Sequence, residues 1–203
     1  MSSRVSFTRM DAATQADHDL LARNFAPYLA EAPDRFLATL AAQREERTSG
    51  YRIDRCEHAV QAATRARRDG ADVDWVVAAL LHDIGDGLAP MNHDRMAAEI
   101  VRPYVREEVT WVVEHHGVFQ QYYTGRFTGA DPEARERFRD HPHFDATAAF
   151  CERWDQSSFD PEYPMKDLDF FAPMVREVFA RKAHDEAHIK PGVVVGVPTG
   201  ADA

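Results

Sequence analysis

The side chains of this chain that could do chemistry are histidines and aspartates set into apolar helical stripes. Six stand out: His58, His82, Asp83, His93, His116 and Asp155. The clearest case is His82-Asp83, which ends the apolar run 75–81. A buried carboxylate costs free energy unless it is paired or bound to metal. Six such residues on five predicted helices therefore predict one shared metal centre.

A purely structural role explains any one of these residues well, but it explains all six together poorly. A single histidine on an apolar face is usually a core residue, and a single aspartate is usually a cap or an ion pair. Burying six polar groups without a shared partner would cost several kcal/mol. Imidazole and carboxylate ligands without thiolate suit iron, manganese or zinc. Six ligands exceed what one ion with an open position needs, so a dinuclear centre bridged by Asp83 fits better.

The elements that must position these residues are predicted to be helical throughout. Apolar periodicity, caps and breaks predict helices over 12–26, 32–46, 52–68, 74–84, 93–102, 105–123, 132–139, 143–156 and 167–183, with a break at Ser49-Gly50. The only β-branched cluster, Val193 to Val195, lies in a Gly/Pro-bounded tail that reads as flexible or docked. The predicted fold is an all-α bundle. The expected parts are an N-terminal helical cap (1–50), a main domain (51–183) and a C-terminal tail (184–203).

Composition narrows the class of protein further. The 203 residues carry 24 Lys plus Arg against 34 Asp plus Glu, a formal charge of −10. This acid excess argues against nucleic-acid and anionic-membrane partners. Two separated cysteines, Cys56 and Cys151, form no disulfide framework, and no apolar leader follows Met1, so we expect a cytoplasmic protein.

The motif Leu80-Leu81-His82-Asp83-Ile84-Gly85, with its flanking histidines and Asp155, resembles the HD-domain superfamily. The resemblance covers about residues 51–180. Two extra histidines after the His-Asp pair look like the dinuclear branches, which include some phosphohydrolases and the mixed-valent diiron oxygenases. Among the latter, the order of motifs and Arg153-Trp154-Asp155 look most like the 2-amino-1-hydroxyethylphosphonate dioxygenase type, of which myo-inositol oxygenase is a relative.

The resemblance implies a specific ligand set. His58, His82, Asp83 and Asp155 would hold one iron, and Asp83 would bridge to a second iron completed by His93 and His116. Catalysis would then centre on His82 and Asp83, with an Fe(II)/Fe(III) pair as cofactor, Mn or Zn remaining possible, and O₂ as co-substrate. His115 is a rival for His116, because it shares a helical face with Trp111 and Phe119. We favour His116, whose stripe is aliphatic and which the family pattern places there.

Departures from the family pattern bear on the substrate. Where many HD phosphohydrolases have a phosphate-binding lysine, this chain has Asp86, which would repel phosphate. Where the phosphonate oxygenase has a lysine, this chain has Gln120, which lies four residues after His116 and therefore on the same helical face. We expect Gln120, Asp86, Tyr51 and Arg126 to contact substrate: Tyr51 matches the family's acidic lid residue, and Arg126 sits in an expected loop.

Three functions compete at this point. The first is a diiron oxygenase acting on a small hydroxylated substrate. The second is a metal-dependent phosphohydrolase of a nucleotide or small phosphate ester, in which metal-bound hydroxide attacks phosphorus. The third is a non-catalytic metal-binding regulator that the ion merely stabilises. The six-ligand set and the missing phosphate lysine favour the first.

Overall fold

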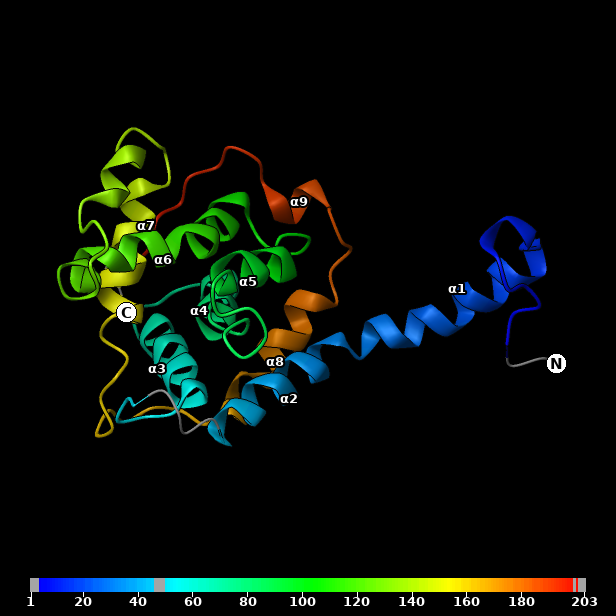
Figure 1. Ribbon diagram of the computed structural model, residues 1–203, viewed down its shortest axis with the longest axis horizontal. Helices are drawn as coiled ribbons and strands as arrows, with labels where there is room; N and C mark the ends of the chain where they lie inside the picture. Colours follow the sequence, from blue (N-terminus) through cyan, green and yellow to red (C-terminus); the bar gives the residue numbers. More distant parts are fainter. Residues whose placement is uncertain (1–3, 46–49, 199, 201–203) are drawn as a thin grey trace.

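The chain folds into helices joined by loops (Figure 1). The computed structural model describes residues 4–45, 50–198 and 200. Their α-helices are α1 (Gln15–Ala30), α2 (Ala32–Ala42), α3 (Arg55–Arg68), α4 (Val73–Leu81), α5 (His93–Val101), α6 (Glu107–Thr128), α7 (Phe144–Phe150), α8 (Leu168–Phe179) and α9 (Glu186–Ile189). No β-strand occurs in these ranges, which confirms the predicted all-α class. None of these helices is both long and apolar enough to cross a membrane.

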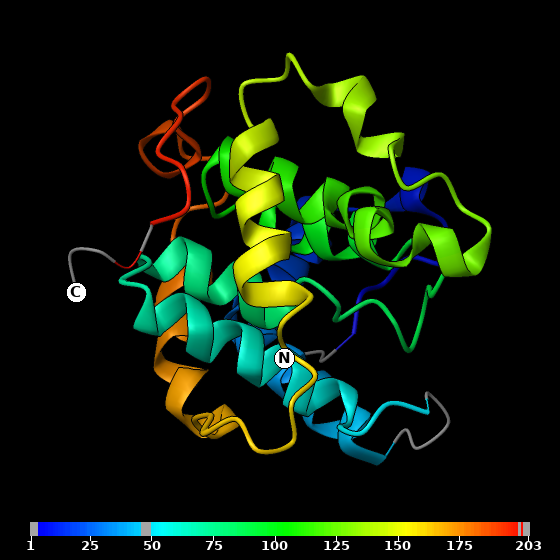
Figure 2. The same ribbon diagram turned by 90° about the vertical axis from the view of Figure 1, so that its left-hand side faces the viewer.

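Helix α4 is the centre of the bundle, because all of its residues after Val73 are buried. Asp72 caps it by accepting the backbone N–H of Trp75. Helix α3 packs along α4, and α6 and α8 also contact it. The aromatic core around it includes Trp75, Phe150 and Trp154, all at most 1 % exposed. Figure 2 shows α7 crossing in front of this central layer. The end of α4, where the His-Asp pair lies, is therefore deep in the protein.

The predicted N-terminal cap divides into two parts that behave differently. Helix α2 packs against α8 and α3, whereas α1 extends away from the bundle (Figure 1). Helix α1 begins with a capping box between Thr14 and Asp17 and has only Asp17 buried. It ends at Ala30, and after Glu31 the next helix begins at Ala32, with Pro33 in its first turn. Only α2 therefore covers the bundle.

Several predicted helices have other bounds in the structure: the helix predicted over 12–26 runs to Ala30, and those predicted over 32–46 and 167–183 end at Ala42 and Phe179. The largest differences lie within residues 105–139. Helix α6 runs to Thr128 instead of ending at 123, and Gly129 closes it with a left-handed φ of 80°. The chain after α6 packs so closely on Gly125 that glycine is required there, because a Cβ would lie 3.0 Å from the Ala130 carbonyl oxygen. The segment predicted as a helix over 132–139 is a 3₁₀ helix, Ala134–Phe138. Residues 1–3, 46–49, 199 and 201–203 lie outside the described ranges, and with them part of the predicted break at Ser49-Gly50 and the ends of the chain.

The C-terminal tail is docked along the bundle rather than loose. The buried carboxylate of Glu108 accepts backbone N–H groups from Val195, at 3.0 Å, and Gly196, at 2.8 Å. The indole N–H of Trp75 donates to the Gly196 carbonyl at 3.1 Å. The Val193 to Val195 cluster thus serves as a strap over α4 and α6.

Replacing Glu108 by alanine should release this strap. The change removes a buried acceptor and leaves two backbone donors unpaired, which costs about 1–3 kcal/mol. Hydrogen exchange of the amides of residues 193–197 should become faster, and the melting temperature should fall. Glu107→Ala is the control with a smaller expected effect, because the bond that Glu107 accepts comes from the backbone N–H of the exposed Gly192, where water can replace the carboxylate. Unchanged exchange in the strap of the Glu108 variant would contradict this role.

Candidate metal centre

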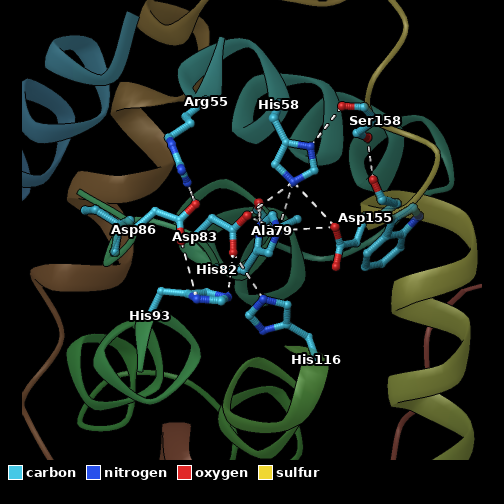
Figure 3. A network of polar contacts seen from close by, with 12 residues as sticks. Arg55, His58, Ala79, His82, Asp83, Asp86, His93, His116, Asp155 and Ser158 are labelled. Carbon is cyan, nitrogen blue, oxygen red and sulfur yellow. Dashed lines mark hydrogen bonds and ion pairs between the residues drawn. The ribbon is translucent and has the colours of Figure 1, made fainter. Parts of the chain in front are cut away.

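Five elements converge on one point inside the bundle (Figure 3). His58 comes from α3, the His82-Asp83 pair follows α4, His93 opens α5, and His116 lies in the middle of α6. Asp155 closes a π-helical turn, Cys151–Asp155, that continues α7. π-turns are rare and occur often at functional sites. The structure therefore brings together all six side chains selected from the sequence.

The first group of possible ligand atoms surrounds His58 Nε2. His82 Nε2 lies 3.2 Å from it, Asp155 Oδ1 lies 3.4 Å from it, and Asp83 Oδ2 lies 3.5 Å from it. The same two carboxylate oxygens lie 3.5 and 3.6 Å from His82 Nε2. Two imidazole nitrogens and two carboxylate oxygens therefore face a common centre.

The second group surrounds the other oxygen of Asp83. Asp83 Oδ1 lies 3.1 Å from His116 Nε2 and 3.4 Å from His93 Nε2. The two oxygens of this one carboxylate thus face two different pairs of histidines. This arrangement is the one a carboxylate needs in order to bridge two cations.

Hydrogen bonds on the outer side of each histidine ring fix which ring nitrogen faces the centre of the cluster. The Nδ1 atoms of His58, His82 and His116 lie 2.9, 2.9 and 2.7 Å from the backbone carbonyl oxygens of Ser158, Ala79 and Val113. A carbonyl can only accept, so each Nδ1 carries the proton and donates it. Each Nε2 lone pair is then free to face the centre, which is the usual preparation of a metal-binding histidine.

The buried carboxylates of the cluster are stabilised by positive charge. Burial acts to raise the pKa of Asp155, but His82 and His58 outweigh it and hold the carboxyl well below its ordinary value. Burial acts to lower the pKa of His58, but the carboxylates of Asp155 and Asp83 outweigh burial, so this pKa is raised. Asp155 Oδ2 is buried and has no hydrogen-bond partner among the described residues. Such an orphaned oxygen is costly unless a cation or water meets it.

These observations fit metal ions. His58, His82 and Asp155 form one triplet with ligand atoms close enough for a single ion, and His82, Asp83 and His116 form another. The donors are imidazole and carboxylate, and the free cysteines Cys56 and Cys151 contribute no atom to either triplet. Nitrogen and oxygen donors of this kind suit iron, manganese or zinc.

The neighbouring histidines have other environments. The His115 ring stacks on Trp111 with 4.0 Å between ring centroids, and His141 stacks on the opposite side of Trp111 at the same distance. His115 Nδ1 lies 2.9 Å from the Trp111 carbonyl oxygen. It is therefore His116, not His115, that faces Asp83.

A cavity of about 580 Å³ opens onto the cluster. Three of the four residues predicted to contact substrate line it: Tyr51, Asp86 and Gln120. Arg126 lies in the last turn of α6 and not in the expected loop, and it is not among the residues that line the cavity, so its contact with substrate stays a prediction. Its guanidinium instead lies over the Phe127 ring, 4.5 Å from the centroid. The expected loop is wrong, because α6 continues through this position.

Sequence reasoning missed several residues of the site. Phe159 stacks on the His58 ring at 4.5 Å and also contacts Tyr51, so it forms an aromatic wall. Arg55 pairs with Asp86. Arg55 could have been found, since it lies three residues before His58 on the same helix and therefore on the same face. No sequence signal marks Phe159.

Comparison with known families gives one match. Residues 55–157 match the HD domain, and this segment contains all six residues of the cluster. No curated protein matches the chain. The matched segment spans half of the chain, and its His-Asp pair is the one that ends the central helix of an all-α bundle. The chain therefore belongs to the HD-domain family.

Proposed function

We propose that this protein is a diiron oxygenase that acts on a small, hydroxylated, uncharged substrate. The observation that carries the proposal is the Asp83 carboxylate, whose two oxygens face separate histidine pairs. One ion would be held by His58, His82, Asp83 and Asp155. The other would be held by Asp83, His93 and His116. An iron pair, when bound, supplies the electrons that activate O₂.

The cavity wall supplies the groups that would bind and orient the substrate. Gln120 offers an amide that can donate to and accept from a hydroxyl group. Burial raises the pKa of Tyr123 to about 12, so its hydroxyl stays protonated and can donate a hydrogen bond. Phe159 and Tyr51 form an aromatic side of the cavity, against which the carbon atoms of a substrate could pack.

The side-chain charges of the cavity wall, apart from those of the metal ions, favour an uncharged substrate. Among the residues that line it in the described part of the chain, Arg55 carries the only guanidinium or ammonium group. That guanidinium is ion-paired with Asp86. A phosphate or phosphonate group would therefore meet a cation already neutralised by a carboxylate. This favours a hydroxylated substrate over a phosphate ester, and so the oxygenase over the phosphohydrolase.

The test is a comparison of two reactions in one protein preparation. Protein loaded with iron without oxygen should show an EPR signal of a mixed-valent pair after partial oxidation. It should consume O₂ in the presence of members of a panel of small polyols. Oxygen-independent release of phosphate from a panel of nucleotides and phosphate esters, with no preference for iron, would establish the phosphohydrolase instead. The absence of a nucleic-acid or membrane partner and the cytoplasmic location stay predictions.

A further inference from the structure

Among the four histidines of the cluster, His93 is the one held least by its surroundings. The His93 side chain is 25 % exposed, whereas those of His58 and His116 are 6 and 2 % exposed. His93 is also the first residue of α5, and the residue before it, Asn92, makes no side-chain cap. A ligand at a loop–helix junction needs other contacts to keep its ring in place.

Asp86 and Pro90 provide such contacts on the outer side of the His93 ring. Asp86 Oδ1 lies 3.4 Å from His93 Nδ1, and the Pro90 carbonyl oxygen lies 3.1 Å from the same nitrogen. Both acceptors favour a proton on Nδ1. The Nε2 lone pair is then left to face Asp83, 3.4 Å away.

Arg55 in turn holds Asp86. Its guanidinium is ion-paired with Asp86 Oδ2, the oxygen that does not face His93. The two side chains are only 29 and 15 % exposed, so water screens this pair incompletely. Figure 3 shows Arg55, Asp86 and His93 in a row that leads from α3 to the centre.

We propose that Asp86 and Arg55 are positioning residues that orient His93 toward the second metal ion. The inference rests on the dinuclear centre proposed above and gives Asp86 a role other than the substrate contact predicted from the sequence. Both oxygens of Asp86 are engaged, one by His93 and the other by Arg55. A carboxylate that orients a metal-binding imidazole in this way typically changes metal affinity by roughly 10–100-fold when it is removed.

Direct coordination is the alternative, since Asp83, Asp86 and His93 lie close enough together to form a triplet. The two nitrogens of an imidazole ring point in divergent directions. Asp86 faces Nδ1, whereas Asp83 faces Nε2. An ion between Asp83 and His93 would therefore lie on the side of the ring away from Asp86.

The experiment titrates metal-free full-length protein with cobalt(II), following binding by calorimetry and by visible absorption, which reports the coordination number. Wild type should bind two ions. Asp86→Ala should lower the affinity for the second ion by roughly 10–100-fold and leave the affinity for the first ion unchanged. Asp86→Asn keeps an acceptor for His93 and should restore most of that affinity. Arg55→Met should lower the affinity for the second ion, and Arg55→Lys, which keeps the positive charge, should restore that affinity.

Asp145→Asn is the matched control, because Asp145 is an exposed aspartate in the first turn of α7 and lies outside the cluster. It should bind both ions as wild type does. Two ions with unchanged affinity and spectrum in Asp86→Ala would overturn the inference and leave the dinuclear centre intact. Equal losses in the Ala and Asn variants, with a lower coordination number, would also overturn it in favour of direct coordination. A wild type that binds only one ion would overturn both proposals.

Discussion

Replacing Asp83 by asparagine should leave the protein folded, with at most one bound metal ion and turnover lowered by roughly 10³-fold or more, which corresponds to about 4 kcal/mol. Asp83 Oδ2 faces His58 and His82, and Oδ1 faces His93 and His116. An asparagine amide offers one neutral oxygen and an NH₂ group that cannot act as a ligand. Only one of the two histidine pairs can therefore keep its carboxylate partner.

The measurement is metal content per chain by mass spectrometry, together with turnover on the substrate that the oxygen-uptake panel identifies. Asp145→Asn is the matched control, since Asp145 is an exposed aspartate in the first turn of α7 and lies outside the cluster. It should keep two ions and full turnover. An Asp83→Asn protein with two ions and wild-type turnover would show that Asp83 is not the bridge.

The sequence predicts the centre well because burial and periodicity constrain it tightly. Polar residues on apolar stripes must meet a shared partner, whatever the details of packing, and the six residues do converge. His116 lies on the aliphatic side of α6, whereas His115 lies on the aromatic side against Trp111. The composition of each stripe therefore favours His116, but periodicity alone leaves both histidines open, and the choice also rests on the resemblance to the family pattern.

The parts that the sequence does not predict depend on contacts between distant segments. The end of α6 depends on how Gly125 meets the Ala130 carbonyl, which helix propensity cannot show. The partner of Asp86 lies on α3, far away in the sequence. Asp86 is therefore open, from the sequence, between a substrate contact and an ion pair, and Arg55 is not identified as its partner. Helix α1 carries the apolar side chains of Leu21, Phe25 and Leu29, but the described part of the chain leaves them exposed.

Metal binding should also stabilise the fold, and removal of metal should reverse the effect. The ligands come from five elements that are close together only in the folded chain, so the ions bind the native state and not the unfolded one. At a free metal concentration of one hundred times the dissociation constant, each site adds about 2.7 kcal/mol. For a domain of this size that raises the melting temperature by roughly 5–10 °C.

Two variants of adjacent histidines separate this effect from general stability. His116→Gln should lose the rise in melting temperature that the second ion provides, because the change removes one of the two imidazoles that face Asp83 Oδ1. His115→Gln disturbs the stack on Trp111 and can lower the melting temperature of the metal-free protein. Its rise on metal addition should nevertheless equal that of wild type, because the difference between loaded and metal-free protein cancels effects on packing. Calorimetric scans with and without a chelator measure both quantities, and an equal loss of the metal-dependent rise in the two variants would argue against His116 as a ligand.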